Sequence, residues 1–416
     1  MTTIQDIKVF CTAPQGINLV VVRVETNQPG LYGLGCATFA YRHLTVQHLI
    51  ETYFKPLLVG RPVNNISELW QLMHQNAYWR NGPIANNAIS GIDMALWDIK
   101  GKMANMPCYE LFGGKMREGV RIYRHVNGRD AAEVEDQIRA LMETGVRHFR
   151  CGASKKSHGS DVYGAAPDYA VKGGHDGIYF DSREHVRELI EFFGEMRARM
   201  GFEPELMTDV HERIHPTDAR VLAHELDPFR LFFIEDIIGP EYMDYFPDIR
   251  AHCVTPLSMG ELFVNNAEFR SVITQRCIDF VRVHPSFLGG VTPCLRLMNF
   301  ANEFGVRVCW HGPGDMNTIG HTVNVHLDLA APNFAVQEWN GTAAANVGIT
   351  GTHERPEAIL EVFDGMPVFD QGFLYANDRP GWGIEFDEVA AAKYPCKLDV
   401  TTWTQMRSLD GSLLTP

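Results

Sequence analysis

The chain has 416 residues, of which 45% are hydrophobic and 21% charged, and its formal net charge is −14 at pH 7. An acidic chain without a basic run argues against nucleic acid or an anionic membrane as its main partner, and no stretch reaches the roughly 20 apolar residues of a membrane span. The nine cysteines form no C-x-x-C pair, and the chain does not start with a basic region followed by an apolar core. We therefore expect a globular, cytoplasmic protein with reduced thiols.

The first part of the chain predicts a small α+β domain. Residues 17–26 are apolar and β-branched, a turn signal follows at 27–30, and a second strand is expected over 31–39. A long helix is expected over 86–104, because apolar side chains recur there at spacings of three and four: Ile89, Ile92, Leu96, Ile99 and Met103. We place the end of this domain at residue 117, just after the glycine-containing stretch 111–115.

The middle of the chain, residues 118–345, predicts a closed parallel barrel. Amphipathic stretches such as 131–144 and 182–200 alternate there with eight short apolar segments, near 120–126, 147–152, 204–211, 230–236, 256–262, 278–284, 307–312 and 335–339. Alternating strands and helices form a parallel sheet, and eight such strands favour a barrel whose site lies at their C-terminal ends. The alternative is an open doubly wound sheet, but no glycine-rich nucleotide-binding motif supports it.

Two segments interrupt or follow this alternation. Residues 152–181 are polar and glycine-rich, and their position after a strand end predicts a lid over the barrel mouth or, alternatively, an oligomer contact. Residues 346–416 are rich in Gly, Pro and Asp, and we expect them to pack on the first domain and the barrel mouth.

Three carboxylates are expected at the barrel mouth. Asp209 ends the third strand, Glu235 follows 26 positions later and Glu261 a further 26 positions later, which places them on adjacent strands. Three acids in a poorly solvated site repel each other. A divalent cation removes this cost, and all-oxygen ligands suit Mg²⁺. The alternative is that each acid pairs with a basic residue, for which Arg150 and Arg282 are available.

Further polar residues are expected at the same mouth, namely His125, Arg150, His211, Arg282, His284, His311 and Glu338. Asp315 follows a Gly-Pro-Gly turn, and Tyr163 in the long segment is within reach of Arg150, where it could act as a base. Strand alternation would put His211 on the same face as Asp209, placed to protonate a leaving hydroxyl. A metal-bound carboxylate substrate can lose its α-proton at such a site, which leads to epimerisation or to loss of a β-hydroxyl.

The helical stretch 88–114, "AISGIDMALWDIKGKMANMPCYELFGG", together with the three carboxylates, resembles the enolase superfamily. Within that superfamily, the chain resembles the D-mannonate dehydratase subgroup, including starvation-sensing homologues, over "AYWRNGP" (77–83), "WHGPGD" (310–315), "NFAVQEW" (333–339) and "PGWGIEFDE" (380–388). The resemblance implies a (β/α)7β barrel, a modified TIM barrel, with an N-terminal α+β capping domain. It also implies a homo-oligomer.

The resemblance implies a role for each matching residue. Asp209, Glu235 and Glu261 correspond to Mg²⁺ ligands, Tyr163 with Arg150 to the base at C2, and His211 to the acid that helps expel the C3 hydroxyl. Substrate contacts would come from His125, Glu261, Arg282, His311, Asp315, Glu338 and Trp382. The implied reaction converts D-mannonate into 2-dehydro-3-deoxy-D-gluconate and water.

Two positions depart from the subgroup. Ala40 stands where the pattern has a substrate-binding asparagine, and Pro313 stands where efficient members tend to have alanine. A slow mannonate dehydratase, a D-gluconate dehydratase and a member acting on another acid sugar therefore stay open. A racemase is disfavoured, because the second strand has no lysine pair and the sixth has no aspartate at its end. A regulatory protein that only senses its ligand is a further alternative.

Overall fold

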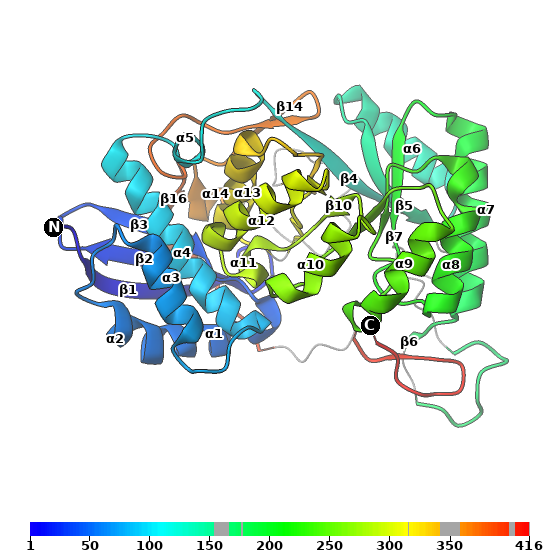
Figure 1. Cartoon of the computed structure of the whole chain (residues 1–416), viewed down its shortest axis with the longest axis horizontal. Coiled ribbons are helices and arrows are strands. Elements are labelled where there is room, and N and C mark those ends of the chain that lie inside the picture. The colour runs from blue at the N-terminus through cyan, green and yellow to red at the C-terminus, as the bar shows by residue number, and fades with distance from the viewer. Residues whose placement is uncertain (154–165, 176–177, 315, 342–357, 399–403, 416) are drawn as a thin grey trace.

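The computed structural model describes residues 1–153, 166–175, 178–314, 316–341, 358–398 and 404–415. Figure 1 shows the N-terminal elements in blue and cyan beside a barrel coloured from teal to yellow. The mixed α/β architecture is the one that the sequence predicts. No helix among the described residues is long and apolar enough to cross a membrane.

The N-terminal part is an antiparallel sheet covered by helices. Its strands are β1 (Ile4–Thr12), β2 (Leu19–Thr26) and β3 (Tyr32–Cys36). Its helices are α1 (His43–Leu49), α2 (Lys55–Leu58), α3 (Ile66–Gln75), α4 (Pro83–Ala104) and α5 (Cys108–Leu111). The structure confirms the strands predicted over 17–26 and 31–39, and β1 is an additional strand.

Helix α4 is the predicted long helix, and both of its ends follow from the sequence. Pro83 occupies the first turn, where its missing N–H costs nothing, and Asn105 ends the helix in the left-handed region at φ 52°. The helix lies directly on β3. A Cβ atom on Gly33 would lie 1.9 Å from the Ala95 carbonyl oxygen, and one on Gly35 would lie 2.0 Å from that of Gly91. Glycine is therefore required at both strand positions for this close approach.

The barrel contains the eight predicted strands in chain order. They are β4 (Val120–Gly128), β5 (His148–Ala153), β7 (Glu205–Asp209), β8 (Ile234–Glu235), β9 (Leu257–Met259), β10 (Phe280–Val281), β11 (Arg307–Val308) and β12 (Gln337–Glu338). Neighbouring strands pair in parallel from β4 to β11, β12 pairs with β4, and a bridge between Val308 and Phe334 completes the ring. The prediction of a closed barrel over an open sheet is confirmed.

Helices surround the barrel between its strands. They are α6 (Ala131–Glu143), α7 (Ser182–Met200), α8 (Pro216–Glu225), α9 (Phe246–Ala251), α10 (Asn266–Thr274), α11 (Pro285–Leu288), α12 (Val291–Glu303) and α13 (Thr318–Ala330). The last strand, β12, has no barrel helix after it among the described residues, which is the expected (β/α)7β order. Inside the ring, a separate apolar cluster that includes Tyr123, Met207 and Phe233 fills the barrel.

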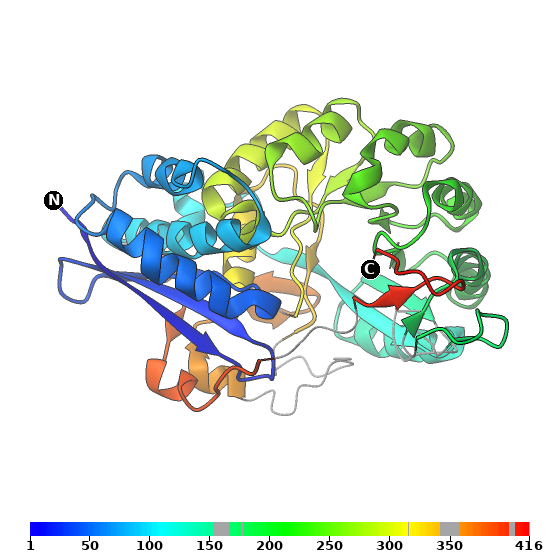
Figure 2. The same cartoon turned by 90° about the horizontal axis from the view of Figure 1, so that it is seen from below.

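The C-terminal segment touches both parts of the molecule. Its elements are α14 (Ala358–Val362), β13 (Phe363–Asp364), β14 (Val368–Asp370), β15 (Phe373–Tyr375), β16 (Glu385–Phe386), α15 (Glu388–Ala391) and β17 (Met406–Arg407). Strand β15 pairs with the first residues of β4, at the end of the barrel away from the mouth, and β17 pairs with β6 (Ile178–Tyr179). Figure 2 shows the orange elements of this segment beside the blue N-terminal sheet.

Asp98 of α4 joins three parts of this architecture. Its buried carboxylate accepts hydrogen bonds from the Leu34 N–H of β3 at 2.9 Å, from the Trp382 N–H of the C-terminal segment at 2.8 Å and from Lys102 Nζ at 2.8 Å. Without this carboxylate, two buried N–H groups would lose their partner, and the Lys102 ammonium would keep only the Tyr32 carbonyl, at 3.1 Å, as a hydrogen-bond partner among the described residues.

Asp98→Ala should therefore lower the free energy of unfolding by about 3 kcal/mol. Chemical denaturation of the two proteins, followed by circular dichroism, measures this difference. Asp244→Ala, at an exposed position, is the matched control and should change it by less than about 0.5 kcal/mol. Equal stabilities of Asp98→Ala and the wild type would contradict the role given to Asp98.

Candidate active site

The expected carboxylates lie at the C-terminal ends of the middle barrel strands. Asp209 is the last residue of β7 and Glu235 the last of β8, and the two pair directly in the sheet register. Glu261 is not the equivalent residue of the next strand, because Ser258 of β9 pairs with Glu235. Glu261 instead lies two residues beyond the end of β9. The equal spacing in sequence therefore gives equivalent positions for the first pair only.

Two further acids, Glu212 and Asp236, belong to the same cluster. Ligand atoms lie within 4.8 Å of one another in three sets: Asp209, His211 and Glu261; Asp209, Glu235 and Asp236; and Glu212, Asp236 and Glu261. Glu212 and Asp236 are not among the residues that the sequence predicts for the site. They directly follow the predicted site residues His211 and Glu235, so two polar residues in a row after a strand are the signal that could have indicated them.

The turns after β7 and β8 are strained where they enter the cluster. His211, Glu212 and Asp236 have φ values of 56°, 58° and 43°, in the left-handed region that side chains other than glycine rarely adopt. The His211 N–H donates to Asp209 Oδ1 at 2.7 Å. His211 Nε2 lies 3.4 Å from Glu261 Oε1. His211 thus lies beside Asp209 as predicted, but a turn places it there and not strand alternation.

Two arginines hold the carboxylates together. Arg150 of β5 places Nη1 2.8 Å from Asp209 Oδ2 and 3.2 Å from Glu235 Oε1. Arg282, directly after β10, places Nη1 3.0 Å from Glu235 Oε1 and 3.2 Å from Glu261 Oε2. The alternative of acids paired with arginines is therefore realised in the structure.

These ion pairs do not balance the charge of the cluster. Among the described residues, two buried guanidinium groups contact a cluster of six buried carboxylates, those of Asp209, Glu212, Glu235, Asp236, Glu261 and Glu338. Arg213 adds a third positive charge near Asp209 and Glu212, so the acids still outnumber the arginines two to one. The excess negative charge is what a divalent cation offsets.

The protonation of the cluster reflects this excess. Burial and the neighbouring carboxylates raise the pKa of Glu212, Glu235 and Asp236 well above the ordinary range. Burial opposes ionisation of Asp209 too, but the charge of Arg150 holds its pKa below the usual value. Within the described part of the chain, Glu212 Oε1, Glu235 Oε2 and Asp236 Oδ2 have no hydrogen-bond partner. Buried oxygens of this kind fit a Mg²⁺ site.

Neutral histidines line the other side of the mouth. Arg150 Nη2 and Asn340 Nδ2 lie 3.1 and 2.9 Å from His125 Nδ1, so the ring proton is assigned to Nε2, which lies 2.7 Å from Glu338 Oε1. His311 Nε2 lies 3.4 Å from Glu261 Oε2. Burial lowers the pKa of His125 to about 4 and that of His311 well below the usual value, so both rings are uncharged donors at neutral pH.

Not every expected site residue belongs to this cluster. Trp382 is fully buried, and its indole donates to the Met94 carbonyl of α4 at 3.0 Å, so the structure does not make it a substrate contact. The expected residues Tyr163 and Asp315 lie outside the described residues. Ala40 is near the mouth, because its neighbour Phe39 packs edge-on against Phe287, whose ring stacks on His284.

Comparison with known proteins agrees with this architecture. The family model "Enolase C-terminal domain-like" matches residues 133–390, and "Mandelate racemase / muconate lactonizing enzyme, N-terminal domain" matches residues 2–113. The chain is 45% identical to a D-galactonate dehydratase family member of Enterocloster bolteae, covering 100% of this chain and 99% of the relative. It is 43% identical to another from Musicola paradisiaca, covering 99% of each.

Solved structures of enolases also resemble this chain over nearly its whole length. An enolase from Pantoea ananatis with bound D-gluconate and Mg is 42% identical to this chain, with a TM-score of 0.93 and 100% of both chains covered. An enolase from Agrobacterium radiobacter with bound Na and L-malate is 26% identical, with a TM-score of 0.80 and 94% and 95% of the two chains covered.

Mg²⁺ binding should become tighter as the pH rises above about 4, the ordinary range of carboxyl groups. Because burial and mutual repulsion raise the pKa of Glu212, Glu235 and Asp236, the metal-free site holds protons to a higher pH than ordinary carboxyl groups do, and the cation must displace them. Calorimetric titration in two buffers of different ionisation enthalpy should therefore detect proton release on Mg²⁺ binding.

Glu235→Gln should weaken Mg²⁺ binding about 100-fold, equivalent to ~2.7 kcal/mol, and should reduce the proton release. Glu205→Gln, at the opposite end of β7, is the matched control and should bind Mg²⁺ as the wild type does. An affinity independent of pH, with no proton release, would contradict this description of the site.

Proposed function

Because the chain belongs to the enolase superfamily and, within it, to the D-galactonate dehydratase family, we propose that it is a Mg²⁺-dependent hydro-lyase of six-carbon acid sugars. The observation that carries this proposal is the set of charges at the barrel mouth. Buried carboxylates, some with oxygens that have no partner among the described residues, lie there beside two arginines and neutral histidines. This combination suits a substrate that has one carboxylate and several hydroxyl groups.

Asp209, Glu235 and Glu261 are the proposed metal ligands, with Glu212 and Asp236 beside them. When bound, Mg²⁺ supplies positive charge next to the substrate carboxylate, which favours loss of the neighbouring α-proton. Arg282 is fully buried and fixed by several carboxylates. It therefore adds positive charge at a defined place.

The proton transfers are assigned to Tyr163 and His211. We assign Tyr163 as the base that removes the C2 proton, because its position corresponds to the base of the subgroup that the sequence resembles, with Arg150 favouring the phenolate. His211 is assigned as the acid that protonates the departing C3 hydroxyl. Its position beside Asp209 and Glu261 supports this assignment, because it brings the ring next to two of the proposed metal ligands. His125, His311 and Glu338 are assigned to binding the sugar hydroxyls.

D-Gluconate is the first substrate to test, because the 42% identical structure from Pantoea ananatis contains it together with Mg. D-Mannonate is the second, favoured by the mannonate-subgroup motifs in the sequence. The two sugars differ only in configuration at C2, and loss of water from either gives the same 2-keto-3-deoxy acid. The choice between them therefore depends on which face of C2 meets the base.

Purified protein with Mg²⁺ should form a 2-keto-3-deoxy acid from at least one member of a panel containing D-gluconate, D-mannonate and D-galactonate. Product formation should stop with EDTA and return with added Mg²⁺. Absence of product from every aldonate, with Mg²⁺ shown to bind, would contradict the proposed reaction.

Exchange of the C2 proton in D₂O, followed by proton NMR, separates the two assigned roles. Tyr163→Phe should lower both exchange and dehydration, by 10²- to 10⁴-fold as an order of magnitude. His211→Asn should lower dehydration to a similar extent while exchange continues. If Tyr163→Phe abolishes turnover of one C2 epimer and spares the other, a different base serves the second face. If His211→Asn abolishes exchange as well, its role as the acid is wrong.

A further inference from the structure

Cys11 and Cys396 differ from the other cysteines of the chain. All nine are described, and these two are partly exposed while the remaining seven are buried. Cys11 belongs to β1 of the N-terminal sheet, and Cys396 belongs to the C-terminal segment. The two thiols that a solvent-borne oxidant can reach therefore come from opposite ends of the chain.

Two hydrogen bonds attach the segment around Cys396 to the chain near Cys11. The Ala13 N–H donates to the Tyr394 carbonyl at 2.7 Å, and Lys397 N–H donates to Asn18 Oδ1 at 3.0 Å. Cys396 lies between these two attachments. On its other side, β1 pairs with β2, where Cys11 lies opposite Val20 and Thr12 lies opposite Leu19. Residues 394–397 thus run along the edge where Cys11 is located.

The side chain of Cys11 lies between helix α1, where its Sγ donates to Gln47 Oε1 at 3.4 Å, and the segment that carries Cys396. The influence of Cys11 and of the Leu19 N–H lowers the pKa of Cys396 in spite of its burial. Cys396 and burial in turn raise the pKa of Cys11 well above its ordinary value. The opposite shifts favour Cys396 as the attacking thiolate and Cys11 as the resolving thiol.

We propose that Cys11 and Cys396 form a reversible disulfide that fastens residues 394–398 to the N-terminal domain. A small-molecule disulfide such as oxidised glutathione is the oxidant. The Cys396 thiolate attacks one of its sulfurs and releases one thiolate. The Cys11 sulfur, after losing its proton, then attacks Cys396 Sγ in the mixed disulfide and releases the second. Two protein thiols are oxidised and one glutathione disulfide is reduced to two thiols.

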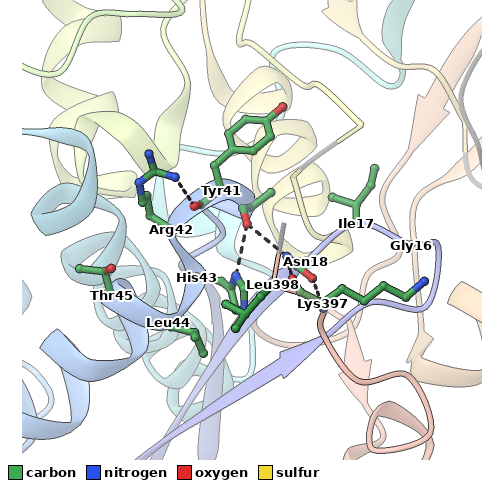
Figure 3. A pocket seen from close by; sticks show the side chains of 11 residues that line it. Gly16, Ile17, Asn18, Tyr41, Arg42, His43, Leu44, Thr45, Lys397 and Leu398 are labelled. Atoms are coloured by element: carbon green, nitrogen blue, oxygen red, sulfur yellow. Dashed lines mark hydrogen bonds between the residues drawn. The ribbon is translucent and has the colours of Figure 1, made fainter. Parts of the chain in front are cut away.

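The disulfide would fix one wall of a cavity of about 650 Å³ near the barrel mouth, shown in Figure 3. Residues 16–18, 40–45 and 397–398 line it. Asn18 joins two of its walls, since Nδ2 lies 3.4 Å from the Ala40 carbonyl and 2.8 Å from that of Lys397. Phe39, next to this wall, packs on Phe287 at the mouth. Fixing Cys396 therefore restrains the loop that carries Ala40.

Full-length protein with Mg²⁺ is incubated with oxidised glutathione, treated with N-ethylmaleimide and examined by intact and peptide mass spectrometry. The expected product has lost two hydrogen atoms, contains one Cys11–Cys396 cross-linked peptide and returns to the dithiol with dithiothreitol. Its Tm should be at least ~2 °C above that of the reduced protein. This readout needs no turnover, so it is independent of the proposed reaction.

Three variants test the order of the steps. Cys11→Ser should accumulate one glutathione on Cys396, because the resolving thiol is absent. Cys396→Ser should leave Cys11 as a free thiol. Cys253→Ser removes a buried cysteine and should form the cross-link as the wild type does. A wild type that retains one glutathione per chain, or in which N-ethylmaleimide modifies both residues after oxidation, would overturn the proposal.

Discussion

Arg282 is the side chain on which the arrangement of the barrel mouth depends. It is fully buried, and its guanidinium reaches Glu235 at the end of β8, Glu261 after β9 and Glu338 of β12. Its Nε donates to the Tyr123 hydroxyl of β4 at 3.0 Å. A single cation thus connects four positions around the ring. Burying it is costly in isolation, and only several carboxylates together repay the lost hydration.

The ion pairs with buried arginines also explain why the acids can lie so close together. Arg150 performs a similar function between Asp209 and Glu235. The two arginines reduce the repulsion among the acids without removing the excess negative charge. The carboxylates are consequently held in place before any cation arrives, so little rearrangement is needed when one binds. Strained turns at His211 and Asp236 are tolerated because these contacts fix the surrounding backbone.

Much of this organisation is contained in simple patterns of the sequence. The spacing of apolar residues gives α4, and the alternation of strands and helices gives the barrel and the mouth. Strand β1 was missed because a bulge between Ile4 and Asp6 breaks the two-residue period, so its buried residues Ile4 and Ile7 are three apart. Periodicity does not reveal a strand with such an interruption.

The differences between the expected and the observed placement of site residues have equally local causes. Spacing alone does not show where a strand ends, so it does not show that Glu261 and His211 lie in turns beyond it. Trp382 follows Gly381, whose φ of 75° turns the chain against Asp98 and buries the indole. A tryptophan in a glycine-rich segment resembles a mobile loop residue, and only the tertiary contact reveals its burial.

The contact between Thr12 and Ala391 has a consequence for synthesis on the ribosome. These residues are 379 positions apart, and the Thr12 hydroxyl donates to the Ala391 carbonyl at 2.9 Å. The N-terminal domain is therefore finished only by residues translated near the end of the chain. During most of translation, the N-terminal domain lacks these C-terminal contacts. The edge of β1 is then open to misassociation or to binding by a chaperone.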